Sequence, residues 1–352
     1  MHVLVVGQTR RWFSASNLRW VDDTVRALRR LRHRVSVFAY REPWAASPSV
    51  ARWAGAVAPL RTALARCPGY SRRATEQRLV ALARRAQPDL TLVLKGECLS
   101  METLSAVKRH TQGPCVSWWV DDPWRYPAAV ECLPVYDDVF VFDQSYIPPL
   151  LAAGVRNAHF LPCACDETVY APMRLSTARQ ARFACDVSFV AWCYPEREAV
   201  VRALAGELEM AVWGGGWGAL ERHRTASGAA VVRGRAVDTR TAAAIYNASK
   251  IGLNIHAAQT RQAGLNTRTF ELLACGAFQL VDRVPGMEAL LDPGRELVCY
   301  ESPEHARQLA KMFLADPSAR CRIAAQGRGR VLAEHTYTVR MRRLCALAGG
   351  TT

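Results

Sequence analysis

LNTRTFELLACGAFQLVD, residues Leu265 to Asp282, is the stretch of sequence that decides the fold. Asn266 or Thr267 can cap a helix, and the unpaired N–H groups of its first turn form a ready site for phosphate. Arg268 adds a planar cation beside them, and Gly276 ends the helix before an apolar run that is typical of a strand. We therefore expect the helix to begin at one edge of a sheet, where open α/β folds bind ligands.

The residues before this stretch form the preceding strand of the same unit. SKIGLNIHA, Ser249 to Ala257, is an apolar pattern that contains Asn254 and His256 near its end. Glu271 lies one turn into the helix, and its carboxylate can accept two hydroxyl groups of a ribose. An ordinary capped helix with surface charges is the alternative, and His256 is as readily structural as functional. The order strand, loop, helix, strand favours a site for a nucleoside diphosphate.

Apolar runs divide the chain into two doubly wound domains. Many are apolar at consecutive positions, which indicates parallel strands covered on both faces. The predicted strands are 2–6, 35–40, 90–95, 115–120, 138–143 and 158–161, then 186–190, 209–213, 229–233, 250–255, 277–281 and 296–299. The predicted domains are residues 1–165 and 166–335, followed by a terminal helix over 336–352 that we expect to pack on the first domain. The Trp-containing segment 44–70 is interpreted as an acceptor-side loop.

The composition favours a cytoplasmic protein. Half of the 352 residues are apolar, which suffices for two domain cores. The 12 cysteines include no CxxC pair and fall mostly in apolar segments, so we expect free thiols in a reducing compartment and no metal site. The start MHVLVVG is too soon polar for a signal peptide, and no apolar run approaches the length of a membrane span.

The net charge of +15 raises the possibility of an anionic partner. Only four of the 46 basic residues are lysines, and the arginines are scattered, which suits a coding bias as well as a binding role. The densest basic run, Arg26 to Arg34, is assigned to a helix with an apolar stripe, and a solvated face is its simpler explanation. Peripheral contact with an anionic membrane is the less favoured alternative, and a nucleic-acid partner is disfavoured.

Strand ends in the second half offer further ligand contacts. VWGGGWG, Val212 to Gly218, follows a strand, and its glycines let a ligand approach the backbone closely. This run lacks the GxGxxG spacing of dinucleotide folds, so hydride transfer is not supported. Arg233 and Arg235 flank a turn after the next strand, where they can edge a base or bind phosphate.

Acidic and aromatic residues gather at strand ends in the first half. WWVDDPW, Trp118 to Trp124, places Asp121 and Asp122 after a buried strand, where a carboxylate can accept a proton from a substrate hydroxyl. A turn before Pro123 is the structural alternative for this Asp-Pro sequence. The predicted acceptor-side residues, some of them from the neighbouring LKGE sequence, are Lys95, Glu97, Trp119 and Trp124.

The second half resembles the glycosyltransferase domain of the spore-maturation-protein (CgeB-like) type, within the GT-B fold. FVAWCYPER, VWGGGW, IYNASKIGLNIH, NTRTFELLACGAFQLVD and HTYTVR occur in the order expected for that domain. The first half resembles the uncharacterised amino-terminal domain often joined to it, through LVLKGE, SWWVDDPW and FLPCACD. The resemblance covers nearly the whole chain and implies two Rossmann-like domains that face a cleft, with carboxy-terminal helices.

The resemblance implies transfer of a sugar from a UDP-, GDP- or dTDP-sugar to an acceptor hydroxyl, without a tightly bound metal or cofactor. The acceptor class is left open among glycans, glycolipids, proteins and small molecules. By the resemblance and the strand-end positions, the predicted catalytic residues are Asp121, Asp122, His256 and Arg268. The predicted donor-binding residues are Glu271, Asn266, Thr267, Thr269, Asn254, Gly214, Gly215, Trp217, Arg233 and Arg235.

One position departs from the pattern of related transferases. Many carry a glutamate eight residues before the ribose acid, where this chain has Ala263. The role of that carboxylate must be filled differently, so the sequence is compatible with either retaining or inverting chemistry. A DNA-modifying sugar transferase, a nucleotide-sugar epimerase and a non-catalytic scaffold of the same fold are the alternative functions.

Overall fold

The computed structural model describes residues 1–8, 19–40, 72–225, 227–229 and 231–349. They form two compact units, which we call unit 1 (Met1–Pro162 with Arg340–Thr352) and unit 2 (Cys163–Val339). Unit 1 is therefore discontinuous in the chain. The whole segment interpreted as an acceptor-side loop, residues 44–70, lies outside the described residues.

Unit 2 contains a parallel six-stranded sheet with the order β12-β11-β10-β7-β8-β9. Its strands are β7 (Cys185–Val190), β8 (Met210–Trp213), β9 (Val232–Gly234), β10 (Ser249–Asn254), β11 (Gln279–Asp282) and β12 (Val298–Tyr300). The chain builds outward from β7 to β9 and then returns to the other side of β7 with β10. The adjacent strands β7 and β10 therefore mark the switch point, which is where doubly wound sheets bind ligands.

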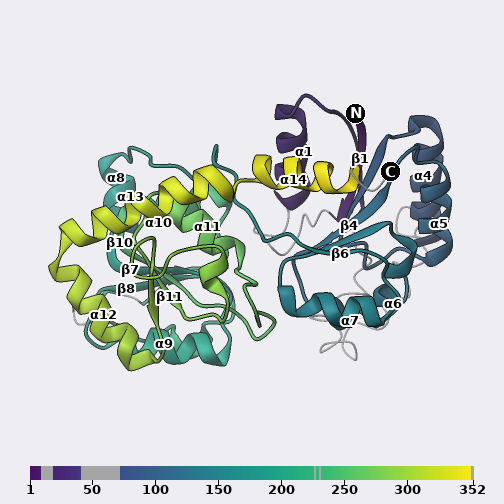
Figure 1. Cartoon of the computed structure of the whole chain (residues 1–352). Helices are drawn as coiled ribbons and strands as arrows, with labels where there is room; N and C mark the ends of the chain where they lie inside the picture. Colours follow the sequence, from purple (N-terminus) through teal and green to yellow (C-terminus); the bar gives the residue numbers. More distant parts are fainter. Residues whose placement is uncertain (9–18, 41–71, 226, 230, 350–352) are drawn as a thin grey trace. The chain divides into compact units, whose positions relative to one another are not determined.

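Helices cover both faces of this sheet (Figure 1). One face carries α9 (Pro195–Ala205) and α12 (Pro303–Ala315), which pack on a core that includes Phe189, Leu253 and Leu280. The other carries α8 (Thr177–Phe183), α10 (Thr239–Ala248), α11 (Thr267–Ala274) and α13 (Pro317–Glu334). Because both faces are covered, the central strands read as continuous apolar runs in the sequence.

Unit 1 has a second parallel sheet, with the order β2-β1-β3-β4-β5-β6. Its strands are β1 (His2–Gln8), β2 (Arg34–Tyr40), β3 (Leu90–Leu94), β4 (Cys115–Trp119), β5 (Asp138–Val141) and β6 (Ala158–Phe160). Every residue of β3, β4 and β5 is buried, which explains their apolar sequences.

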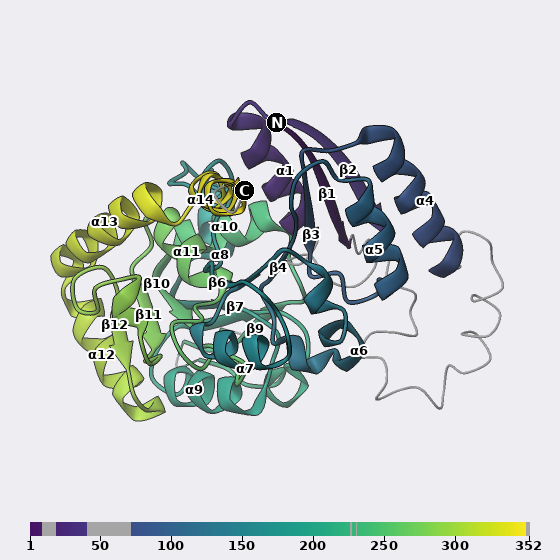
Figure 2. The ribbon, with the colours of Figure 1, turned by 45° about the vertical axis from the view of Figure 1, so that its right-hand side comes forward.

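The helices of unit 1 include two that lie side by side, α4 (Arg72–Ala86) and α5 (Met101–Arg109) (Figure 2). The others described are α1 (Arg19–Arg30), α6 (Pro127–Val130) and α7 (Ile147–Ala152). The last helix, α14 (Tyr337–Gly349), begins in unit 2, and its residues from Arg340 onward belong to unit 1. Arg340 Nε donates to the carbonyl of Pro162 at 2.9 Å. This hydrogen bond joins the last residue of the first segment of unit 1 to the first residue of its second segment.

The predicted fold class is confirmed, and all twelve predicted strands are present with ends that differ by at most three residues. The basic run Arg26 to Arg34 is an exception, because α1 ends at Arg30 and the backbone at Arg32 turns with φ 62°. Arg34 already belongs to β2. This run is therefore not a single basic helix face, which removes the geometry on which the membrane alternative rested.

Candidate active site

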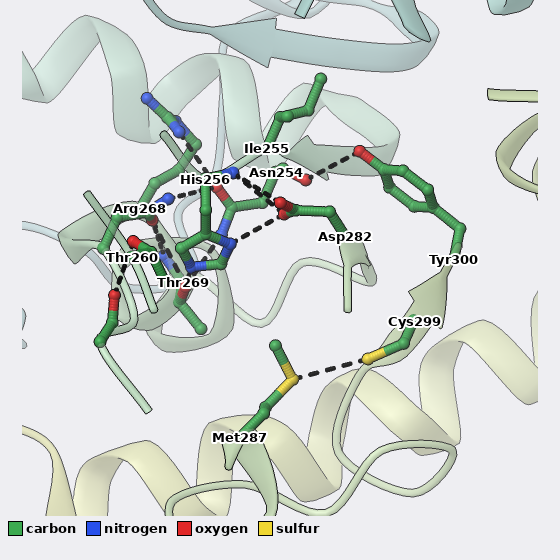
Figure 3. A network of polar contacts seen from close by, with 12 residues as sticks. Asn254, Ile255, His256, Thr260, Arg268, Thr269, Asp282, Met287, Cys299 and Tyr300 are labelled. Carbon is green, nitrogen blue, oxygen red and sulfur yellow. Dashed lines mark hydrogen bonds and ion pairs between the residues drawn. The ribbon is translucent and has the colours of Figure 1, made fainter. Parts of the chain in front are cut away.

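The site in unit 2 is built where β7, β10 and the first turn of α11 meet (Figure 3). Asn266 caps α11, because its Oδ1 accepts a hydrogen bond from the backbone N–H of Thr269 at 3.1 Å. Arg268 extends from the first turn across the switch point. Its Nε donates to the carbonyl of Val190 at 2.9 Å, and its Nη1 donates to Asn254 Oδ1 at 3.0 Å. The guanidinium is thus fixed in place at the carboxyl ends of the two strands.

Asn254 is the centre of a fully satisfied polar network. Its Nδ2 donates to Thr269 Oγ1 at 2.8 Å and to Gln279 Oε1 at 2.9 Å. Its Oδ1 accepts from Arg268 and from Asn266 Nδ2, both at 3.0 Å. Asn254 and Thr269 have no exposed surface. Both were predicted to touch the donor. Because both are buried here, we interpret them as residues that hold Arg268 and Asn266 in position.

His256 belongs to the same network, and its catalytic role stays a prediction. Its ring is buried, and Nδ1 lies 2.8 Å from Asp282 Oδ1. Its backbone N–H also donates to the Asp282 carboxylate at 3.0 Å, and Nε2 lies 3.4 Å from Thr269 Oγ1. His256 therefore ties the end of β10 to the end of β11.

Glu271 lies on the second turn of α11, half-buried and facing two tyrosines. The rings of Tyr170 and Tyr246 stack with centroids 6.3 Å apart and an interplanar angle of 26°. Burial, followed by the Glu271 carboxylate that accepts a hydrogen bond from its hydroxyl, raises the pKa of Tyr170 well above its ordinary value. Tyr170 thereby keeps its proton and orients the carboxylate.

Arg197 is a residue that the sequence analysis missed. It lies on the first turn of α9 and is only 7% exposed. Its Nη1 donates to the carbonyl of Trp192 at 2.9 Å and its Nη2 to the carbonyl of Ile255 at 3.1 Å, while its Nε has no hydrogen-bond partner within the described ranges. Burial, and then the like charge of Arg268, lowers the pKa of Arg197 to about 10. The guanidinium carbons of Arg197 and Arg268 lie 5.9 and 5.2 Å from the centroid of the same Phe189 ring, so two arginines are held close together at the switch point.

The departure at Ala263 has a structural counterpart. Ala263 is fully buried, with a left-handed backbone φ of 57° and an N–H that donates to the carbonyl of Pro285 at 2.7 Å. A larger side chain at this position would have to displace its buried neighbours. The site is therefore built without a carboxylate from this position.

The glycine-rich loop after β8 packs closely on the protein itself, and the donor contacts of Gly214 and Gly215 stay a prediction. A Cβ on Gly214 would lie 1.8 Å from the carbonyl oxygen of Ala191, and one on Gly215 would lie 2.4 Å from the indole of Trp192. The glycines are needed because the protein itself packs against them. Trp217 is 2% exposed and donates from Nε1 to the carbonyl of Ala191 at 2.9 Å, so it is a core residue.

The two arginines near β9 differ in position. Arg233 Nη1 donates to the carbonyl of Ala184 at 2.7 Å, which lies just before the amino end of β7, away from the switch point. Its role as a donor contact stays a prediction. Arg235 is exposed immediately after β9 and stays a candidate.

Unit 1 gathers a separate charged cluster after β3 and β4. Lys95 Nζ donates to Asp121 Oδ2 at 2.9 Å and to the Tyr126 hydroxyl at 2.8 Å, and lies 3.7 Å from Glu97 Oε1. Burial alone would lower the pKa of Lys95, but Asp121 and Glu97 outweigh it, so the pKa is raised. The Lys95 backbone is also left-handed, with φ 71°. The cluster is thus held at the expense of local backbone strain, which is common at functional sites.

The other predicted residues of unit 1 divide between structural and accessible positions. Asp122 accepts a hydrogen bond from the backbone N–H of Trp124 at 2.9 Å, so it caps a short turn instead of facing a substrate. Trp119 is fully buried and belongs to the core. Trp124 is 39% exposed, and its ring stacks on Tyr146 with centroids 5.9 Å apart. Asp121 and Trp124 therefore stay candidates for acceptor contacts.

The described residues contain neither a metal-binding cluster nor a membrane-spanning helix. Within the described ranges, no three His, Cys, Asp or Glu side chains are grouped so that they could hold a metal ion. None of the helices described is both long and apolar enough to cross a bilayer.

Comparison with known proteins agrees with this geometry. Residues 197–346 match the sequence profile of the family described as "Glycosyl transferase-like". The chain is 22% identical over 251 residues to spore protein CgeB of Bacillus subtilis (strain 168), covering 68% of this chain and 76% of that protein.

Solved structures with the same fold cover nearly the whole chain. The sucrose-phosphate synthase (tll1590) of Thermosynechococcus elongatus superposes with a TM-score of 0.66 and 14% identity, over 100% of this chain and 99% of that one. Anabaena Alr3699/HepE in complex with UDP gives a TM-score of 0.62 and 13% identity, over 99% of this chain and 100% of that one. The expected family resemblance is confirmed. The chain has the GT-B fold, and its residues 197–346 match the glycosyl transferase-like family.

Proposed function

We propose that unit 2 binds a nucleoside diphosphate sugar through Arg197, Arg268 and the start of α11, and that the sugar passes to an acceptor hydroxyl. The observation that carries this proposal is the pair of arginines held together at the switch point. Folding forces two like charges together, and a bound anion relieves their repulsion. The first-turn N–H groups of α11 add dipoles of the same sign.

The diphosphate is assigned to the arginines because it is the leaving group of the reaction. When the bond between the sugar's anomeric carbon and the phosphate oxygen breaks, negative charge grows on that oxygen. Donors fixed in advance stabilise such charge without reorganisation, and each is worth about 3 kcal/mol. Arg268 is fixed by Val190 and Asn254, and Arg197 by Trp192 and Ile255, so both meet this condition.

Glu271 is assigned to the ribose of the donor. Its carboxylate lies on the same helix as Arg268, one turn farther from the phosphate site. Two adjacent ribose hydroxyls can donate to one carboxylate. Because HepE, which shares the fold, binds UDP, we propose UDP-sugars as the first donors to test, followed by GDP- and dTDP-sugars.

Asp121 is assigned to the acceptor. In this proposal the acceptor oxygen forms its bond to the anomeric carbon, and Asp121 orients the hydroxyl or takes its proton. Lys95 holds the carboxylate in place, and the exposed ring of Trp124 offers an apolar surface nearby in the chain. The acceptor is a glycan, glycolipid, protein or small molecule.

The charge of the chain favours one particular alternative acceptor. A net charge of +15 also suits nucleic acid, as in a DNA-modifying sugar transferase. DNA duplex binding that weakens steeply with salt would support a DNA acceptor. Duplex affinity no higher than that of ordinary non-specific binding would exclude a DNA acceptor. Vesicles of anionic lipid tested in the same way would detect peripheral membrane contact. The free thiols suit a reducing compartment such as the cytoplasm.

Calorimetry with a panel of UDP, GDP and dTDP and their sugars tests the proposed function. One nucleotide should bind, and Arg197→Met should weaken it about 30-fold or more, since losing a buried charged hydrogen bond costs about 2–5 kcal/mol. Arg202→Met is the matched control, because Arg202 lies on the same helix but is exposed and pairs with Glu198 at 2.7 Å. If no nucleotide in the panel binds to the wild-type protein, the donor proposal is wrong.

A further inference from the structure

Trp192 is a large aromatic residue that the proposed donor contacts do not use. It is 55% exposed, the highest value among the large apolar side chains that stay exposed in the described parts of the chain. Single exposed apolar residues need no explanation by themselves. Trp192 differs because its neighbour in the same turn, Tyr194, is also 46% exposed and both adjoin the arginine pair.

The backbone around Trp192 is held rigidly. The N–H of Ala191 donates to the carbonyl of Trp213 and the N–H of Cys193 to the carbonyl of Gly215, both at 2.9 Å. The carbonyl of Trp192 itself accepts from Arg197 Nη1 at 2.9 Å. The turn therefore continues the parallel pairing of β7 and β8 beyond the strands.

The indole rests on glycine backbone. A Cβ on Gly215 would lie 2.4 Å from Cζ3 of Trp192, and one on Gly216 would lie 3.1 Å from its Nε1. One part of the ring system thus packs on the loop after β8, where only glycine leaves room, while more than half of the side chain stays open. An aromatic ring fixed in this way is a preformed platform, and little entropy is lost when a ligand covers it.

The order of groups along the site indicates what covers this platform. Glu271 faces Tyr246 of α10, which packs on one face of the sheet. Arg268 reaches from α11 to Val190 at the end of β7. Trp192 lies two residues beyond Val190 and leads into α9, which packs on the opposite face. Across the edge of the sheet, the groups therefore follow one another in the order Glu271 carboxylate, Arg268 guanidinium and Trp192 ring.

A nucleoside diphosphate sugar is linear, with the diphosphate between the ribose and the sugar. If the ribose lies at Glu271 and the diphosphate at Arg268 and Arg197, the transferred sugar extends toward Trp192. We infer that the Trp192 indole forms the donor-sugar subsite, by stacking on the C–H face of the transferred sugar. This inference rests on the proposed function.

The chemistry of the two surfaces is complementary. The face of an indole carries partial negative charge, and the C–H groups on one face of a pyranose carry partial positive charge. Such a contact excludes water from the sugar while leaving its hydroxyl groups free for polar partners. Trp192 is thus a specificity-determining residue, because it contributes to the affinity for the nucleotide sugar but not to the affinity for the bare nucleotide.

Calorimetry with two ligands tests the inference. UDP and UDP-glucose, or the corresponding pair for whichever nucleotide binds best, are titrated into the wild-type protein, Trp192→Ala and Trp192→Phe. Trp192→Ala should weaken the nucleotide sugar about 3- to 10-fold, a typical range for one lost aromatic contact, and leave the bare nucleotide within about twofold. Trp192→Phe retains a ring and should recover most of the affinity for the nucleotide sugar.

A second variant moves the ring without removing it. Gly215→Ala places a methyl group 2.4 Å from the indole, so the ring must shift and the same selective loss for the nucleotide sugar is expected. Met312→Ala is the control, because Met312 is equally exposed, at 53%, and lies on α12 away from the strand ends. Circular dichroism verifies that each variant is folded.

The outcomes separate this inference from the proposed function. Equal weakening of nucleotide and nucleotide sugar by Trp192→Ala would assign the ring to the nucleotide, and no change in either would remove it from the site. Both results overturn the inference but leave the donor proposal standing. If the wild-type protein binds neither ligand of any pair, the donor proposal fails and the inference fails with it.

Discussion

The polar network around Asn254 gives a prediction whose size can be worked out from the structure. Asn254→Ala removes four hydrogen bonds, to Thr269, Gln279, Asn266 and Arg268, from a position with no access to water. Buried hydrogen bonds contribute about 1 kcal/mol each, and partners left unsatisfied cost more. We expect the free energy of unfolding of unit 2 to fall by about 4 kcal/mol.

The same substitution should affect the donor site. Arg268 loses its hydrogen bond to Asn254 but keeps the one to Val190, so its guanidinium is held less firmly while its charge is retained. A loss of about 1 kcal/mol in binding corresponds to roughly fivefold weaker nucleotide binding. Asn254→Asp keeps the acceptor oxygen for Arg268 and Asn266, so it should bind nucleotide better than Asn254→Ala while still being destabilised.

Urea unfolding followed by circular dichroism, with and without nucleotide, measures both effects. The transition that nucleotide shifts belongs to unit 2, because only a ligand that binds the folded unit stabilises it. Asn157→Ala is the control, since Asn157 Nδ2 makes one bond, to the carbonyl of Asp137 at 3.0 Å in unit 1, and should cost about 1 kcal/mol. If Asn254→Ala costs no more than Asn157→Ala and nucleotide affinity is unchanged, the network does not organise the site.

Three further substitutions probe separate parts of the molecule. Glu271→Gln should weaken nucleotide binding about 10-fold by calorimetry, because charge-assisted hydrogen bonds are worth about 1.5–3 kcal/mol. The control Glu288→Gln changes an exposed glutamate and should leave nucleotide affinity unchanged. Equal affinity in both variants would contradict the assignment of Glu271 to the ribose. Asp121→Asn should lower kcat about 100-fold in a transfer assay while nucleotide affinity stays constant, and full turnover would dispose of the proposed base. Met341→Ala, at a fully buried position of α14, should destabilise unit 1 by about 2–4 kcal/mol in urea unfolding, and an unchanged transition would show that α14 is not part of its core.

The sheets could be predicted from the sequence because their physical signal is local. β3, β4 and β5 are buried along their whole length, so each appears as a continuous apolar run. The cap at Asn266 was also predictable, since the helix start, the capping residue and the first-turn arginine are adjacent in the chain. Some strand ends were misjudged by up to three residues because pairing there depends on neighbouring strands.

The roles of polar side chains could not be predicted as well. A sequence shows that Asn254 and His256 stand at a strand end, but not that both turn inward and are consumed by bonds to Thr269 and Asp282. Arg197 was missed for the opposite reason. One arginine among many gives no local sign of burial, although its place after FVAWCYPE, on the first turn of a helix that follows a strand, was the available clue.

The discontinuity of unit 1 has a consequence for the order of events during synthesis. Its residues Arg340–Thr352 follow all of unit 2 in the chain, and Met341 and Leu344 of that segment are fully buried. The ribosome therefore delivers a contiguous unit 2 before unit 1 has acquired its last helix. Domains generally fold in the order in which they emerge. Here we expect the reverse, with the donor-binding half maturing first on the nascent chain and the amino-terminal half closing last.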